Sequence, residues 1–195
     1  MIFDAYIINL KKDIGRKYSC NEFINIFQAK IWHGIDANQI KNNKVSKWAT
    51  KISATESAKL TKKNILQFFY DNSEKKYLLI LEDDIFLHND FLDKNNIDIF
   101  FNKLNYFLLN NDISLLYLGI SRHIIPNENS IKDLNFKSFS NYFNNNPQKC
   151  TGAYSFIINK EYINDLMIRI NNETLYGQPF DLSCLGYISN KYPNK

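Results

Sequence analysis

The sequence is poor in cysteine and histidine, with three residues of each among its 195. The cysteines Cys20, Cys150 and Cys184 are scattered and odd in number. This pattern favours reduced thiols of a cytosol-like compartment over a disulfide framework. No Cys-x-x-Cys pair or paired Cys/His spacing occurs, so a structural zinc site is not expected.

Long apolar runs and blocks of one charge are also missing. No stretch approaches the ~20 apolar residues of a membrane span, and the first ten residues lack the basic and long apolar regions of a signal peptide. We therefore expect a cytoplasmic protein without a transmembrane segment. Charged residues make up 23% and the net charge is +4. Without a basic block, binding to nucleic acid is not expected, and the sequence leaves the oligomeric state undefined.

What is present is a globular composition in which strand and helix patterns alternate. Hydrophobic residues make up 45%, including 15 Phe and 12 Tyr. No internal repeat or linker divides the chain, so one α/β domain over 1–195 with a largely parallel sheet is predicted. Polar loops are expected at 37–50 and 121–149. Strands are predicted at 5–10, 30–36, 76–81, 114–119 and 150–158, and helices at 16–27, 53–70, 89–109, 160–170 and 180–187.

The most informative segment joins an apolar run to three carboxylates. Residues 77–84 read Tyr-Leu-Leu-Ile-Leu-Glu-Asp-Asp, which predicts a strand buried on both faces and ending at a cluster of acids. Ligands of open α/β sheets bind beyond the carboxyl ends of the strands. Adjacent carboxylates repel unless a cation lies between them. Glu82 and Asp84, two residues apart, point the same way and are candidate ligands for Mn²⁺ or Mg²⁺.

Two other interpretations of the cluster stay open at this point. A solvated acidic turn after a strand is common and carries no chemistry. A phosphoryl-transfer acid pocket is the third possibility, but it normally needs a strand-end Lys and a Ser or Thr around a nucleophilic Asp, and no clear set of these occurs. Asp83, directed away from its neighbours, is a candidate to bind a sugar hydroxyl or to hold a loop.

Five segments together resemble glycosyltransferase family 25, which includes bacterial lipooligosaccharide galactosyltransferases and collagen galactosyltransferase domains. The segments occur in the order of that family and span about residues 3–187. They are Tyr-Ile-Ile-Asn-Leu at 6–10 with Arg16, Gly-Ile-Asp-Ala at 34–37, Leu-Ile-Leu-Glu-Asp-Asp-Ile at 79–85, Thr-Gly-Ala-Tyr-Ser-Phe-Ile-Ile at 151–158, and Pro-Phe-Asp at 179–181.

The sequence departs from the family on the helix that precedes the carboxylates. Members usually carry Glu-x-Gly-Cys-x-x-Ser-His there, whereas this chain reads Glu-Ser-Ala-Lys-Leu-Thr-Lys-Lys at 56–63. Glu56 is kept, but Lys59, Lys62 and Lys63 replace Cys, Ser and His. The chain also ends sooner after Asp181 than typical members do.

The resemblance implies a GT-A fold, a Rossmann-like α/β sheet that binds a nucleotide-sugar. It implies metal-assisted, inverting transfer of a hexose, galactose in the first place, from a UDP-sugar to a hydroxyl of a glycan or protein, as in lipopolysaccharide biosynthesis. Glu82 and Asp84 would hold Mn²⁺ or Mg²⁺ on the donor diphosphate, and Asp181 would be the general base. The donor itself would contact Ile8, Asn9, Leu10, Arg16, Asp36, Asp83, Gly152 and Tyr154.

Structural roles compete for several of these residues. Arg16 is also compatible with a surface position at a helix start, Asp36 with a turn, and Asp181 with a helix N-cap. Tyr154 is also compatible with core packing. The alternative functions are a catalytically inactive descendant that binds a glycan or partner, and a Mg²⁺-dependent phosphoryl-transfer domain that requires no sugar.

Overall fold

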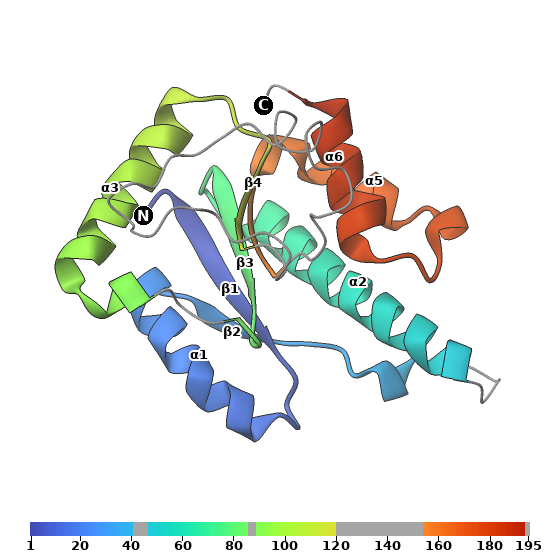
Figure 1. Cartoon of the computed structure of the whole chain (residues 1–195). Helices are drawn as coiled ribbons and strands as arrows, with labels where there is room; N and C mark the ends of the chain where they lie inside the picture. The colour runs from blue at the N-terminus through green and yellow to red at the C-terminus, as the bar shows by residue number, and fades with distance from the viewer. Residues whose placement is uncertain (41–46, 86–88, 120–153, 194–195) are drawn as a thin grey trace.

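The computed structural model describes residues 1–40, 47–85, 89–119 and 154–193, and every structural statement below concerns these residues. Five strands form one sheet in the order β2-β1-β3-β5-β4 (Figure 1). The strands are β1 (Phe3–Asn9), β2 (Lys30–His33), β3 (Tyr77–Glu82), β4 (Leu115–Gly119) and β5 (Ser155–Asn159). The main helices are α1 (Ile14–Phe27), α2 (Lys47–Asn72), α3 (Lys94–Asn110), α5 (Ile163–Ile170) and α6 (Gly186–Lys191).

The sheet is mixed, so the predicted α/β class is confirmed and the prediction of a largely parallel sheet is met only in part. β1 pairs in parallel with β2 and β3, whereas β5 pairs antiparallel with both β3 and β4. β5 therefore runs opposite to the other four strands. The sequence carries no helix pattern between the fourth and fifth predicted strands, and without a crossover helix a parallel return is not favoured.

Helices cover both faces of the sheet (Figure 1). The side chains of β3 alternate between two apolar cores. Leu79 and Leu81 pack with α1 and α3, around residues such as Phe27. Leu78 and Ile80 pack with α2, α5 and α6 on the other face. Residues 77–81 are all at most 1% exposed, which confirms the prediction of a strand buried on both faces.

Element boundaries differ from the prediction mostly at helix starts. The helix expected at 53–70 begins earlier, at Lys47, so Ser53 is a buried residue within α2. No glycine or proline lies between residues 47 and 53 to stop the helix. The helix expected at 89–109 is a 3-10 turn, Asn89–Leu92, followed by α3, which Asp93 caps by accepting from Asn95 N. The helix expected at 180–187 begins as a π-helix, Asp181–Leu185, and continues as α6.

Two further expectations concern thiols and membranes. Cys20 and Cys184 are buried and free, and burial raises the pKa of both thiols, which keeps them unreactive. Cys150 lies outside the described residues, as does the loop predicted at 121–149. None of the described helices has the length and apolar character to cross a membrane.

Candidate functional site

The predicted donor residues gather where the parallel strands β2, β1 and β3 end. Ile8 lies opposite Glu82, and Asn9 lies opposite His33. The chain leaving β2 stays attached to this edge, because Gly34 N donates to Asn9 O at 3.1 Å. The acids that follow β2 and β3 are thereby brought to the same edge of the sheet as Asn9.

Asn9, Asp83 and Arg16 form one contact, although they come from three different segments. Asn9 Nδ2 donates to Asp83 Oδ2 at 2.7 Å, and Arg16 Nη1 lies 3.3 Å from Asp83 Oδ1. Asn9 is 2% exposed and Asp83 is largely buried, whereas more than half of the Arg16 side chain is exposed. The attraction of Asp83, followed by a smaller one from Asp84, raises the pKa of the Arg16 guanidinium. The guanidinium is therefore fixed as a cation at the rim of the edge.

Asp36 pairs with a lysine that the sequence analysis did not single out. Lys12 Nζ lies 2.7 Å from Asp36 Oδ2, and Asp36 Oδ1 accepts from Asn38 N at 3.0 Å. These two hydrogen bonds, that from Lys12 first, lower the pKa of Asp36. The backbone contact is the turn-forming role named above for Asp36. Lys12 adds a second exposed cation to this edge. It precedes Asp13, whose carbonyl oxygen accepts a hydrogen bond from Asn9 Nδ2 at 3.4 Å.

Glu82 meets a buried lysine from α2. Lys62 Nζ lies 2.5 Å from Glu82 Oε1, and its side chain is 4% exposed against 27% for Glu82. The ammonium also lies 5.3 Å from the centre of the Phe180 ring. On the other side, Glu82 N donates to Tyr154 O at 2.8 Å, which fixes the end of β3 to the start of β5. Glu82 is therefore held both through its backbone and through its carboxylate.

The remaining predicted residues have different surroundings. Ile8 and Leu10 pack against Gly34, where an added Cβ would come within 3.3 Å and 3.1 Å of their side chains. Their side chains shape the turn after β2. Asp181 follows Phe180 and begins the π-helix, so it lies one residue from the aromatic ring that covers Lys62. Tyr154 is placed beside Glu82 by its backbone, and Gly152 lies outside the described residues.

The described residues do not by themselves build a site for a divalent cation. Of the two expected ligands, Glu82 already pairs with Lys62, and Asp84 is exposed. The neighbouring Asp83 is held by Asn9 and Arg16. Throughout the described part of the chain, no three His, Cys, Asp or Glu side chains are grouped so as to hold a metal ion. Binding of Mn²⁺ or Mg²⁺ by Glu82 and Asp84 stays a prediction.

Lys12 and Lys62 are the two site residues that reasoning from sequence missed. Lys12 lies between the two parts of the first matching segment, 6–10 and Arg16, but is one of two adjacent lysines in a polar turn. Lys62 was noted only as a departure from the family. A signal was available, because Glu56, Lys59 and Lys62 recur at intervals of three residues and therefore lie on one face of a helix. Lysines on one face of the helix that precedes an acidic strand end indicate ion pairs between that helix and the strand end.

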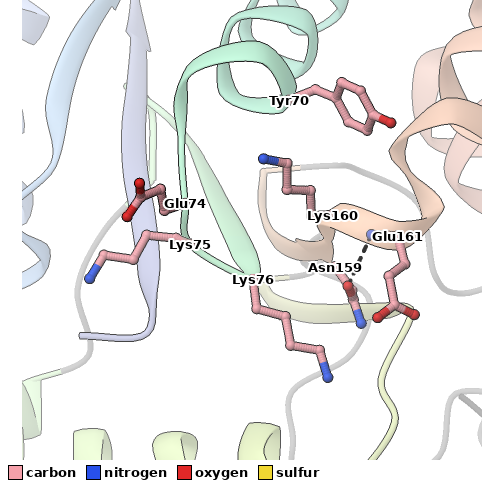
Figure 2. Close-up of a pocket in the computed structure, with 7 residues that line it drawn as sticks. All are labelled: Tyr70, Glu74, Lys75, Lys76, Asn159, Lys160 and Glu161. Atoms are coloured by element: carbon pink, nitrogen blue, oxygen red, sulfur yellow. Dashed lines mark hydrogen bonds between the residues drawn. The ribbon is translucent and has the colours of Figure 1, made fainter.

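A separate hollow of about 360 Å³ opens at the opposite end of the sheet. Figure 2 shows its lining, contributed by the end of α2, the start of β3 and the end of β5. The lining residues are Tyr70, Glu74, Lys75, Lys76, Asn159, Lys160 and Glu161. Two of its lysines already hold backbone carbonyls, Lys160 that of Ser73 and Lys75 that of Met1. The hollow shares no residue with the predicted donor site.

Comparison with known proteins adds little to this geometry. No family model matches the chain, and no curated protein does. Among solved structures, the chain is similar to a glycosyltransferase involved in the glycosylation of the major capsid of PBCV-1. The identity is 10%, the TM-score is 0.45, and the alignment covers 94% of this chain and 75% of that one. A likeness at these values establishes neither the fold nor the function of this chain.

Proposed function

We propose that the protein is a glycosyltransferase that binds a UDP-sugar at the carboxyl edge of β1, β2 and β3. The observation that carries the proposal is the contact of Asn9 and Arg16 with Asp83. Asn9 and Arg16 belong to one segment that resembles family 25, and Asp83 belongs to another. Asn9 precedes Asp83 by 74 positions and Arg16 precedes it by 67. A solvated acidic turn would not require a buried Asn to reach across from the first strand.

The charges at this edge suit a nucleoside diphosphate. Arg16 and Lys12 are exposed cations that pair with Asp83 and Asp36, and an arginine can bind phosphate through two parallel hydrogen bonds. Sugar hydroxyls suit the carboxylates of Asp83 and Asp36, which accept hydrogen bonds. A phosphoryl-transfer site would instead need a nucleophilic carboxylate with a strand-end Lys and a Ser or Thr around it, and the sequence offers no clear set of these.

The proposed reaction is inverting transfer of a hexose, with galactose as the first sugar to test. The acceptor hydroxyl oxygen forms a bond to the anomeric carbon as the bond from that carbon to the diphosphate oxygen breaks. The electron pair leaves with UDP, and the proton of the acceptor passes to a carboxylate, for which Asp181 is the candidate. The support for inversion and for galactose is the resemblance to family 25.

Donor binding is tested by thermal unfolding with UDP, UDP-galactose and UDP-glucose, because a ligand that binds only the folded state raises the melting temperature. We expect a dose-dependent rise for wild type that is strongly reduced in Asp83→Asn. Asp71→Asn removes an exposed carboxylate on α2, outside the proposed site. This variant is the matched control and should respond like wild type. Equal responses of the two variants, or none in wild type, would count against the donor site.

Product formation separates an enzyme from an inactive descendant. Asp181→Asn should keep the thermal response to UDP-galactose while losing transfer to a panel of glycan and peptide acceptors. Donor binding without product from wild type across that panel would favour the binding protein instead.

A further inference from the structure

The Lys62 ammonium is buried at the place where the resemblance calls for a metal ion. Its side chain is 4% exposed, and Nζ lies 2.5 Å from Glu82 Oε1. An ammonium is removed from water at a cost of several kcal/mol unless it is paired and hydrogen-bonded. The chain nevertheless places this lysine, on the buried face of α2, against an acid at the end of the central strand.

The ammonium keeps hydrogen-bonding capacity that the described residues do not use. It has three N–H donors, and among the described residues it donates to Glu82 Oε1. Lys62 Nζ also lies 5.3 Å from the centre of the Phe180 ring. An aromatic ring attracts a cation electrostatically but is not a conventional hydrogen-bond acceptor. Anionic oxygens are the natural acceptors for the remaining N–H groups.

A divalent ion at this edge would share the carboxylate of Glu82 with this ammonium. Mn²⁺ or Mg²⁺ at this edge would need Glu82 and Asp84 as neighbouring ligands, with oxygen atoms directed at the ion. Glu82 instead directs Oε1 at Lys62. A cation held by both residues would then lie next to the ammonium, and the two positive charges would repel each other.

We propose that Lys62 replaces the divalent cation of this site, neutralising Glu82 and offering its remaining N–H groups to the donor diphosphate. The part concerning the diphosphate rests on the proposed function. The part concerning the metal ion rests on the pairing of Lys62 with Glu82 alone. The protein would accordingly bind its UDP-sugar without Mn²⁺ or Mg²⁺, with the positive charge supplied by α2.

The metal part is tested with Mn²⁺ alone, by isothermal titration and by the paramagnetic resonance of free Mn²⁺. Wild type should show no saturable binding, whereas Lys62→Met should gain a site because the ammonium that pairs with Glu82 and repels a cation beside Asp84 is removed. Lys63→Met removes the neighbouring, half-buried lysine of α2 and should behave like wild type. A stoichiometric Mn²⁺ site in wild type, or no gain in a folded Lys62→Met variant, would overturn the proposal.

The donor part uses UDP affinity in EDTA and in Mn²⁺. Wild type should bind UDP equally in both, and Lys62→Met should bind it about tenfold more weakly or worse in EDTA, as expected for one lost charge-assisted hydrogen bond. Wild-type binding that requires Mn²⁺ would overturn the replacement. If wild type bound no UDP in either buffer, the proposed function would fail while the Mn²⁺ titration still decided the metal part. If Lys62→Met does not fold, the wild-type measurements still test both the metal part and the donor part of the proposal.

Discussion

Single side chains in this protein owe their chemistry to burial, and Tyr77 is a clear example away from the site. Its ring is fully buried at the start of β3, and its hydroxyl donates to Leu108 O, the carbonyl of a residue on α3, at 2.8 Å. Burial, followed by repulsion from Asp112 and Glu161, raises its pKa to about 12. The hydroxyl therefore stays protonated, and the strand stays attached to α3, at any physiological pH.

Tyr77→Phe should lower the free energy of unfolding by about 1 kcal/mol near neutral pH, since one hydrogen bond is lost while the ring remains. A tyrosine with a raised folded-state pKa contributes stability that is complete below its ordinary pKa of 10.0 and is lost as pH rises toward about 12. The difference between wild type and Tyr77→Phe should therefore shrink across that range. Urea unfolding at pH 7, 10 and 11 measures it, and a difference that grew with pH would contradict the assignment.

At the scale of elements, α2 holds the segment before α6 through a buried ion pair. Lys59 Nζ lies 2.6 Å from Glu56 Oε1 and donates to Leu175 O at 2.7 Å. Glu56 Oε1 also accepts from Gly177 N at 2.6 Å, and Gly177 has a φ of 77°, a conformation that favours glycine. Two residues at helical spacing thereby fix the turn that leads to Phe180 and Asp181.

Lys59→Met should lower the free energy of unfolding by about 3 kcal/mol, because Glu56 and the Leu175 carbonyl lose a buried partner. The double variant Glu56→Gln with Lys59→Met should be less destabilised than the sum of the two single variants, since no unpaired charge is left. Chemical unfolding of the four proteins gives the coupling energy, with Lys63→Met as the control on the same helix. Simple additivity would show that the pair does not act as a unit.

Local sequence patterns predicted the strands and helices well where a short segment determines both the burial and the direction of the chain. The residues of β3 and the meeting of Asn9 with Asp83 follow from apolar runs that end in polar residues, because parallel strands end at the same edge. The direction of β5 does not follow, since it depends on how the chain returns between β4 and β5. Lys62 and Lys12 were missed because a lysine in sequence looks solvated until its acidic partner, from another element, is placed beside it.

At the scale of the molecule, one sheet is shared by two apolar cores, one on each face. Leu79 belongs to the core under α1 and α3, and its neighbour Leu78 to the core under α2, α5 and α6. Both side chains are completely buried in the central strand. Because β3 contributes to both cores, neither core can be disrupted without disturbing the strand that carries the carboxylates. We therefore predict that the chain unfolds as one cooperative domain.

Leu78→Ala and Leu79→Ala form a matched pair for this prediction, with the same chemistry and burial on opposite faces. Each should cost about 2–5 kcal/mol and lower the midpoint of a single transition. Far-UV circular dichroism reports the helices of both faces, and tryptophan fluorescence reports partly the α2 face, where Trp32 packs against Tyr6 and Phe68. The two signals should change together in both variants and in Ile168→Ala, an exposed control. If Leu79→Ala separated the circular dichroism transition from the fluorescence transition, the two cores would be independent units, and stabilisation by UDP would then have to be assigned to one of them.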